Sequence, residues 1–530
     1  MIFVSKSNFK KRKEIFYFVI LLVFSISFNQ YYGYIGVLPI DSFLIFNSGY
    51  DVLNGYLPFK DYWTIKGPLL DIIQAFFFKI FGVSWFSYVI HASVFNFIIT
   101  IATFYTLIKF ELNINYCFFY ALLVSILAYP TAGTPFSDHH VTILSIIALF
   151  NFILALKTKS NYYWFVLPVF LGLAFLSKQA PSGYIFIIIA ILSVAYFSIN
   201  FDIRKIFFVF FGGLSFIILF VLIMKINEIS LISFFEQYIL FPQSLGKSRL
   251  EWLLPLEFNR IILRFKLIHL SLLVLIIVCV KKIIEDYKYL KNDEFLIITS
   301  LIGTSFALIM HQLMTINAKF IFFIIPILTG FSHVYYLKYF KDKNYILYLL
   351  IFLSFSSTVY YQYNYIDNRR FMDLKEVNIK NAIDAKILDK KLNKLKWITV
   401  LYPDNPKKEI SNLQEAIKII KNDNRNKILV TDYQFISVFL SSYDYSPTRF
   451  WFEYHGYPTK DNEYFEIYKN FFISKLKENK IEIVYTIKPL FGDDDDDVLK
   501  TVLDKSCVKK TALTEILDSH LILTCNELNN

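Results

Sequence analysis

Long apolar runs dominate the first two thirds of the chain and alternate with short polar connections. A helix needs about 20 apolar residues to cross a bilayer, and about eleven runs approach this length. Their centres are Ile15–Phe28, Val89–Lys109, Cys117–Ala128, Val141–Leu156, Tyr163–Leu176, Gly183–Phe197, Ile206–Met224, Leu263–Val280, Phe295–Met310, Phe320–Tyr336 and Tyr345–Tyr360. The pattern predicts a polytopic α-helical membrane protein with about 11 transmembrane helices.

The first run follows a basic stretch from Lys6 to Lys13, as in a signal peptide, but no small-x-small cleavage site comes after it. We therefore expect an uncleaved first transmembrane helix. With the amino terminus inside, the inside connections are basic, as the positive-inside rule requires. They hold Lys109, Lys157, Lys159, Arg204, Lys205, Lys281, Lys282, Lys288, Lys291, Lys338, Lys341 and Lys343. This orientation predicts a multi-pass protein of the cell (inner) membrane, with a cytoplasmic amino terminus.

After the last run the pattern changes to short helical and strand-like segments. A helix is expected at Leu413–Asn422, and strands at Trp397–Leu401, Lys427–Thr431, Ile481–Thr486 and Leu521–Thr524. Alternating strands and helices indicate an α/β domain. We therefore predict a membrane domain over residues 1–362, with an interfacial first loop at 29–88. Residues 363–530 then form an extracytoplasmic soluble α/β domain.

Two features of this second domain, a pair of cysteines and a run of aspartates, could have a chemical role. Cys507 and Cys525 both lie in it, and their spacing leaves a disulfide and two free thiols equally open. The run from Asp493 to Asp497 lacks the ligand spacing of a calcium loop, so it favours a solvated turn over a metal site.

The amino-acid composition supports a membrane protein and limits the kinds of partner that it is expected to bind. Hydrophobic residues make up 56% of the chain, charged residues only 18%, and the mean hydropathy is +0.47, which excludes an ordinary soluble protein. The net charge of +11 would suggest nucleic acid in a soluble protein. Here the basic residues flank apolar runs, so we expect membrane lipids and no nucleic acid as partners.

The polar loop from Asp41 to Gly82 is the first candidate for chemistry. It contains Asp41, Asp61 and Lys66, and two amphipathic pieces, Ser42–Leu53 and Leu69–Phe81. Such pieces are expected to lie in the membrane interface. Asp41 can cap the helix that begins at Ser42, or it can act as a general base. From its position alone, capping ranks first.

Further polar residues gather at the outer ends of the predicted spans. Lys66, Lys178 and Lys319 are cations on the side where the positive-inside rule does not expect them. Each alone fits a lysine reaching the headgroup layer, but the three together near an acidic loop favour a bound phosphate. Asp138, His139 and His140 begin the fourth span. We expect His139, His140 and Asp61 to bind sugar or phosphate, and a divalent cation stays open.

Several of these stretches together resemble the GT-C membrane glycosyltransferases. The resemblance is closest to the glycosyltransferase family 39-like branch, which contains protein O-mannosyltransferases and the aminoarabinose transferases of lipid A. It spans roughly residues 15 to 335. The stretches that carry it are Pro39–Asp41, Lys66–Leu70, Phe78–Gly82, Asp138, Gly172–Lys178 and Lys319–Pro326.

The resemblance implies a GT-C-like fold and an inverting transfer of a sugar from a polyprenyl-phosphate donor on the outer face. The acceptor would be an extracytoplasmic glycan, lipid or protein. It also implies that Asp41 is the catalytic base, that Lys66 binds the donor phosphate and that Asp138 is a second acidic site residue. The chain departs from the pattern at Ser42, where many relatives have a second acid, and at Gly67, where the commoner motif has proline.

Two other functions stay open from the sequence. A transporter or flippase of polyprenyl lipids or polysaccharide predicts internal repeats and broken spans, and neither is visible. The scarcity of ionisable residues near the centres of the spans also counts against a proton-coupled pump. The other alternative is a non-catalytic GT-C-like scaffold that acts through its outer domain.

Overall fold

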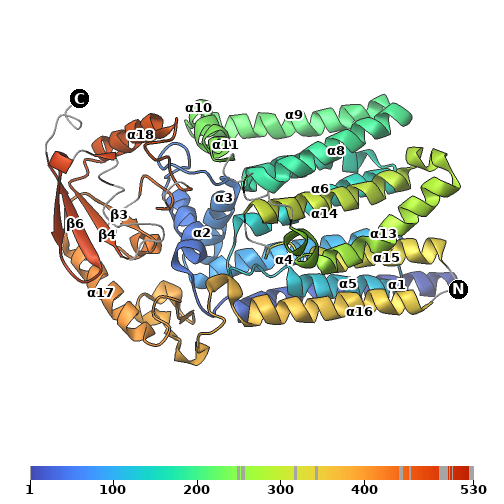
Figure 1. Cartoon of the computed structure of the whole chain (residues 1–530), viewed down its shortest axis with the longest axis horizontal. Helices are drawn as coiled ribbons and strands as arrows, with labels where there is room; N and C mark the ends of the chain where they lie inside the picture. The colour runs from blue at the N-terminus through green and yellow to red at the C-terminus, as the bar shows by residue number, and fades with distance from the viewer. Residues whose placement is uncertain are drawn as a thin grey trace.

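The computed structural model describes residues 2–246, 251, 257–315, 319–340, 344–440, 446–452, 455–488, 499, 502–503 and 505–523. The protein is a bundle of long helices with a smaller mixed domain at one end (Figure 1). The amino terminus lies at the other end of the bundle. The bundle helices are α1 (Ile2–Tyr32), α4 (Trp85–Lys109), α5 (Ile114–Leu127), α6 (Ser137–Thr158), α7 (Asn161–Ser177), α8 (Gln179–Ile199), α9 (Ile203–Ile226), α13 (Lys266–Glu285), α14 (Asp293–Met314), α15 (Ile324–Tyr339) and α16 (Asn344–Tyr361).

The described residues contain eight helices that are long and apolar enough to cross a membrane, so the protein is a multi-pass membrane protein. They correspond to α1, α4, α6, α8, α9, α13, α14 and α16. The predicted count of about eleven is not confirmed. The other three predicted spans form α5, α7 and α15, which have only 14, 17 and 16 residues and fall short of a full crossing.

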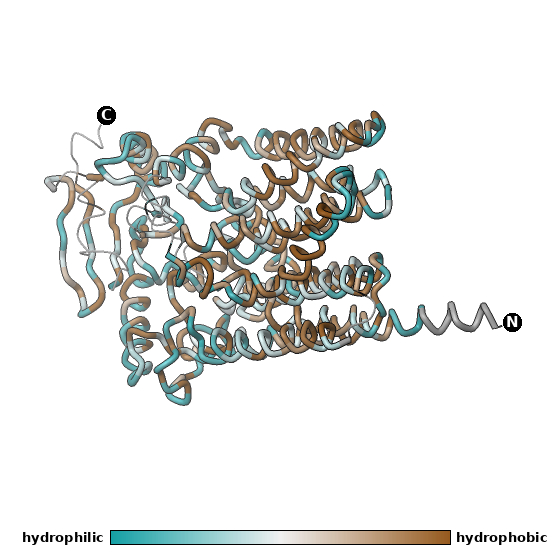
Figure 2. Tube along the Cα trace, turned by 45° about the vertical axis from the view of Figure 1, so that its right-hand side comes forward, coloured by the Kyte–Doolittle hydropathy of each residue, from teal (hydrophilic) through white to brown (hydrophobic). Residues whose placement is uncertain are grey.

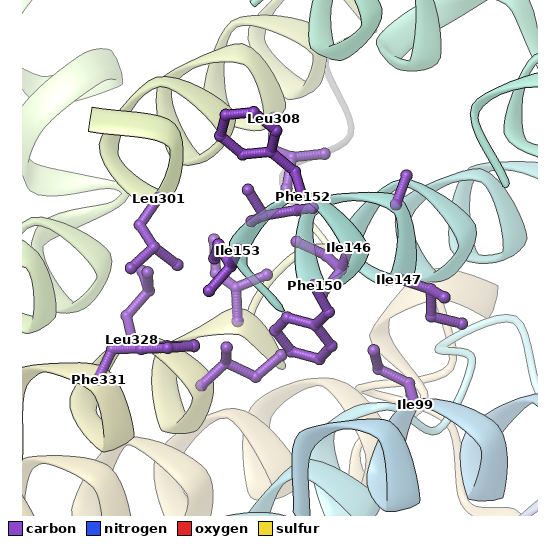
Figure 3. Close-up of a cluster of buried hydrophobic side chains, with 14 of the residues drawn as sticks. Ile99, Ile146, Ile147, Phe150, Phe152, Ile153, Leu301, Leu308, Leu328 and Phe331 are labelled. Atoms are coloured by element: carbon purple, nitrogen blue, oxygen red, sulfur yellow. The ribbon is translucent and has the colours of Figure 1, made fainter. Parts of the chain in front are cut away.

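The core of the bundle is built around α6. Its side chains Ile146, Phe150 and Ile153 pack among residues of α4, α14 and α15, including Leu301 and Phe331 (Figure 3). In contrast, only 6% of the apolar stretch of α9 is buried. Helix α9 packs against α7 on one side, and the rest of its apolar surface is exposed, which is suited to a lipid environment. Hydrophobic residues predominate along the bundle helices, and hydrophilic residues mark several of the turns between them (Figure 2).

The C-terminal domain contains a four-stranded sheet in the order β3-β4-β6-β5. Strands β3 (Lys427–Thr431) and β4 (Ile483–Ile487) are parallel and are joined through α18 (Phe465–Glu478). Strands β6 (Leu517–Ile522) and β5 (Val508–Ala512) continue the sheet antiparallel. The other elements of this domain are α17 (Pro406–Asn422) and the small pair β1 (Ile383–Asp384) and β2 (Lys396–Trp397).

The α/β character of this domain follows the prediction, but its details differ. Strand β2 is shorter than the predicted Trp397–Leu401, and β6 begins four residues before the predicted Leu521. Strand β5 was not predicted, because its sequence VKKTA is polar and most of it is exposed at the sheet edge. Cys507 is buried and disulfide-bonded, while Cys525 and the run Asp493–Asp497 lie outside the described residues.

Two helices of the first loop lie between the bundle and the C-terminal domain (Figure 1). Helix α2 (Pro39–Leu53) is mostly buried, and its Phe43 stacks on Phe435 of the domain at a ring separation of 3.9 Å. Its position between two protein layers differs from the predicted interfacial one. Helix α3 (Leu69–Phe81) keeps the predicted amphipathic character, with polar residues such as Gln74 buried and Phe76 exposed. An apolar outer face fits the membrane interface.

A buried ion pair joins the first loop to the C-terminal domain. The guanidinium of Arg449 donates to the carboxylate of Asp71, and neither side chain is more than 2% exposed. Asp71 also accepts from Ser48 of α2 at 2.8 Å and from Tyr62 at 3.2 Å. The carboxylate of Asp71, in the first turn of α3, thus contacts three other segments of the chain. These contacts hold the C-terminal domain against the first loop.

Replacing only one residue of this pair should leave the other charge buried without a partner, so each single loss counts more than it does in the double variant. Arg449→Met leaves a buried carboxylate without its cation, so we expect a loss of about 3–5 kcal/mol in the free energy of unfolding. Asp71→Asn retains an acceptor for Ser48 and Tyr62. The double substitution should therefore lose less than the sum of the two single ones. Chemical denaturation of the solubilised protein measures all three, and additive losses would contradict the coupling.

Candidate active site

A cavity of about 340 Å³ opens where the bundle, the first loop and the C-terminal domain meet. Four of the predicted site residues line it: Asp41, Lys66, Asp138 and Lys178. They come from four different segments of the chain. The remaining walls are largely apolar and consist of Ile40, Leu44, Ile65, Phe136, Gln179, Pro242, Thr315, Phe371, Phe450, Phe452 and His455. The cavity therefore places charged groups among aromatic walls.

Asp41 lies in the first turn of α2 and is half-buried. The residue before the helix is Leu38, and the side chain that accepts from its backbone N–H is Ser42, at 2.9 Å. Asp41 forms no hydrogen bond or ion pair with any described residue, so it does not cap the helix. Burial raises the pKa of Asp41 to about 6, an effect that Lys66 opposes and Asp138 reinforces. A carboxylate with this pKa and free oxygens suits a general base.

Asp138 has a different environment in the same cavity. It begins α6, and its two oxygens both accept from the ammonium of Lys178, each at 2.7 Å. Nε2 of His311, from the end of α14, lies 2.9 Å from Oδ1. Lys178 stands at the junction of α7 and α8, so this cluster joins the ends of α6, α7, α8 and α14 that face the C-terminal domain. Asp138 therefore compensates and orients Lys178, and its oxygens are already engaged.

Lys66 is held by the close packing of its loop against the bundle. The carbonyl of Ile65 accepts from the side chain of Gln179 at 3.1 Å. At Gly67 an added Cβ would lie 1.9 Å from the carbonyl oxygen of Leu176, so only glycine fits against the end of α7. The departure from the proline of the commoner motif therefore has a structural reason. The ammonium of Lys66 lies 5.4 Å from the ring centre of Phe450.

Lys319 stands beside the cavity rather than in its wall. Its backbone N–H donates to Gln312 at 3.0 Å, and its ammonium lies 5.3 Å from the ring centre of Phe371, which does line the cavity. Burial lowers the pKa of Lys319, and nearby Arg370 contributes in the same direction. The positive charge of Lys319 lowers the pKa of Asp41, so it acts on the site electrostatically.

His139 and His140 are buried away from the cavity wall. Nε2 of His139 lies 2.6 Å from the carbonyl oxygen of Ala128. Nδ1 of His140 lies 3.0 Å from the carbonyl oxygen of Phe136, and its Nε2 lies 3.1 Å from Nε2 of His91. A carbonyl only accepts, so Nδ1 of His140 carries the proton. The contact between His140 and His91 packs α6 against α4, and neither His139 nor His140 lines the cavity.

Asp61 also lies outside the cavity. Its carboxylate accepts from the backbone N–H of Leu57 at 2.7 Å and closes a turn in the first loop. Among the described residues, no group of three or more His, Cys, Asp or Glu side chains is arranged to hold a metal ion. Asp41 and Asp138 share a cavity, but the oxygens of Asp138 are bound by Lys178 and His311. This pair does not fit a divalent cation.

Two contributions to the site were not predicted. His311 carries no sequence signal of its own, because nothing in its spacing indicates that α14 brings it to Asp138. Phe450, Phe452 and His455 come from the C-terminal domain, more than 380 residues after Asp41. A resemblance that ended near residue 335 gave no signal for them.

Comparison with known families agrees with the resemblance. Residues 65–224 match the family described as dolichyl-phosphate-mannose-protein mannosyltransferase. The matched segment begins next to Lys66 and includes Asp138 and Lys178. The match indicates a membrane glycosyltransferase, and the family implies a donor in which the sugar is carried on a lipid phosphate. No curated protein matches the chain.

Asp138 lines the cavity and the two histidines after it do not, so we expect substitutions of Asp138 and His140 to affect activity differently. Asp138→Asn removes the partner of Lys178 in the cavity, so sugar transfer should fall by about 10²-fold or more. His140→Gln keeps a hydrogen-bonding side chain between α4 and α6 and should leave the transfer rate unchanged. Rates on a labelled polyprenyl-phosphate sugar, at equal amounts of folded protein, compare the two. A large loss in the His140 variant with a small one in the Asp138 variant would reverse this assignment.

Proposed function

We propose, from the family match of residues 65–224 and the geometry of the cavity, that this protein is an inverting glycosyltransferase. It transfers a sugar from a polyprenyl phosphate to an extracytoplasmic glycan, lipid or protein, with Asp41 as general base. The observation that carries this proposal is the carboxylate of Asp41, which has no hydrogen-bond or ion-pair partner among the described residues and lies in the same cavity as Lys66 and Lys178. A base and cations for a phosphate are the two requirements of this reaction.

The chemistry follows from these charges. Asp41 accepts the proton of the acceptor hydroxyl as its oxygen attacks the anomeric carbon. The bond between that carbon and the phosphate oxygen breaks on the opposite face of the sugar, so the configuration inverts. The polyprenyl phosphate leaves as an anion without protonation. Lys66 would neutralise the charge that builds on it, and Lys178 and Lys319 would contribute from either side.

The two acids of the cavity would then have unequal roles. Asp138 is engaged by Lys178 and His311, so it would act by orienting Lys178. Asp41 has unengaged oxygens and a raised pKa, which makes it the better proton acceptor. This division resembles other active sites in which two carboxyl groups are separated by environment.

An apolar groove next to the cavity supports a lipid-borne donor. It has a volume of about 760 Å³ and is lined by the loop 52–59 and by residues of α3, α7 and α9. Pro68 lines this groove, and Lys66 lines the charged cavity, so both spaces adjoin the turn at Gly67. We propose that the polyprenyl chain lies in the groove with its phosphate at Lys66.

The orientation of the protein is part of the proposal. At the end of the bundle that carries the amino terminus, Lys159 pairs with Asp293, and Lys338 pairs with Glu294. Clusters of lysine at this end favour a cytoplasmic location. The cavity and the C-terminal domain would then face outward from the inner membrane, where an extracytoplasmic acceptor is available.

Replacing Asp41 tests the catalytic role directly. Asp41→Asn keeps the size of the side chain but removes the proton acceptor, so transfer should fall by about 10²–10⁴-fold. Asp61→Asn is a matched control, because Asp61 is an acidic residue of the same loop outside the cavity. Its activity should stay near that of the unmodified protein. Full activity of the Asp41 variant would refute the assignment.

The pH dependence provides an independent test. The base works only as a carboxylate, so kcat/KM should fall about tenfold per pH unit below about pH 6 and level off above it. Lys66 lowers the pKa of Asp41, and Lys66→Met should therefore move this acid limb to higher pH. A pH–rate profile of both proteins at low donor concentration measures the shift. A limb that stays in place in the Lys66 variant would exclude Asp41 as the titrating group.

A further inference from the structure

The cavity is not complete without the C-terminal domain. Phe450, Phe452 and His455 of this domain line it together with the bundle residues Asp138 and Lys178. Phe450 is only 9% exposed and packs in a cluster with Trp63, Ile65 and Trp451. Its ring is therefore held in a fixed position, and the cavity next to Lys66 has a rigid aromatic wall.

A short ladder of backbone hydrogen bonds fixes where this wall stands. The N–H of Trp63 donates to the carbonyl of Pro447 at 2.8 Å, and the N–H of Arg449 donates to the carbonyl of Trp63 at 3.0 Å. Thr448 and Trp63 form a bridge of the parallel type, and both are buried. The segment before Phe450 thus pairs like a strand with the segment that leads to Lys66.

The side chain of Arg449 locks the same ladder. Its guanidinium bonds to Asp71 and lies 3.4 Å from the hydroxyl of Thr64. The Thr64 hydroxyl in turn accepts from the backbone N–H of Lys66 at 3.1 Å. A continuous chain of contacts therefore runs from the C-terminal domain to the backbone of the lysine.

The ring of Phe450 meets the ammonium end of that lysine. Nζ of Lys66 lies 5.4 Å from the ring centre, within the range of a cation–π interaction. A lysine side chain has a flexible four-carbon stem, so an ammonium that must bind phosphate loses rotamer freedom on binding. An aromatic face that already attracts the ammonium reduces this loss, because the side chain is preorganised.

We propose that Phe450 is a positioning residue for the donor phosphate, and that the C-terminal domain supplies it as an integral part of the active site. The ring holds the ammonium of Lys66 at the cavity, and the ladder through Trp63 and Arg449 keeps the ring in place. This inference rests on the proposed function, because it takes Lys66 as the phosphate-binding group. The ligand class is a polyprenyl phosphate, bound through its headgroup.

Binding of polyprenyl phosphate to the purified full-length chain tests the inference without knowledge of the sugar. Phe450→Leu keeps an apolar side chain but removes the aromatic face, so the Kd for polyprenyl phosphate should rise about 3- to 30-fold. The Kd for the uncharged polyprenol should not change, because it offers no phosphate to Lys66. Phe450→Trp should retain tight binding, since its ring also attracts a cation.

A matched control and a second replacement keep the result interpretable. The ammonium of Lys391 lies 5.6 Å from the ring centre of Phe439, in the same domain but outside the cavity wall, so Phe439→Leu should leave both Kd values unchanged. If Phe450→Leu does not fold, a fluorinated phenylalanine at position 450 keeps the shape of the ring and weakens the attraction of its face. It should then raise the Kd for polyprenyl phosphate in the same way.

The Lys66 variant separates failure of this inference from failure of the proposed function. Lys66→Met should weaken polyprenyl phosphate binding, and adding Phe450→Leu to it should cause no further loss. If Lys66→Met leaves the Kd unchanged, the phosphate site itself is misplaced. If Lys66→Met weakens binding but the Phe450 replacements do not, or if the two effects are additive, the positioning role of Phe450 is overturned.

Discussion

The buried ion pair between Asp71 and Arg449 is the interaction on which the arrangement of the site depends. Asp71 belongs to the first loop and Arg449 to the C-terminal domain, and both are sealed from solvent. A buried charge is tolerated only when it is paired and hydrogen-bonded, and Ser48 and Tyr62 complete the shell around Asp71. The pair therefore holds the domain in one position on the bundle, and the cavity is the space left between them.

Within that space, environment gives similar side chains different properties. Asp41 and Asp138 each lie in the first turn of a helix and line the same cavity, yet among the described residues only Asp138 is bound by a lysine and a histidine. Asp41 is desolvated and has no hydrogen-bond or ion-pair partner among the described residues, and burial raises its pKa into the range useful for proton transfer near neutral pH. The two lysines of the cavity also differ in their contacts. Lys178 is paired with Asp138, and the ammonium of Lys66 lies beside the ring of Phe450.

The C-terminal domain is packed tightly against the rest of the protein and is not attached through a linker alone. Strand-like pairing at Trp63 and Thr448, stacking of Phe43 on Phe435 and the Asp71–Arg449 pair all join the same two regions. Helix α2, whose first turn carries Asp41, is buried between them. The bundle, the first loop and the C-terminal domain together form the cavity.

The amino-acid sequence alone determined the class of protein, most of its helices and four of the residues that line the cavity. Apolar runs and lysines in the connections are local properties, and Asp41, Lys66, Asp138 and Lys178 sit at recognisable places relative to them. The number of full spans could not be derived, because α5, α7 and α15 are apolar but short. Only the tertiary structure decided which polar residues meet. It took His139 and His140 into the core, left Asp61 in a turn, and brought His311 and Phe450 to the site. These contacts depend on how segments far apart in the sequence pack against each other, and the packing cannot be read from the sequence alone.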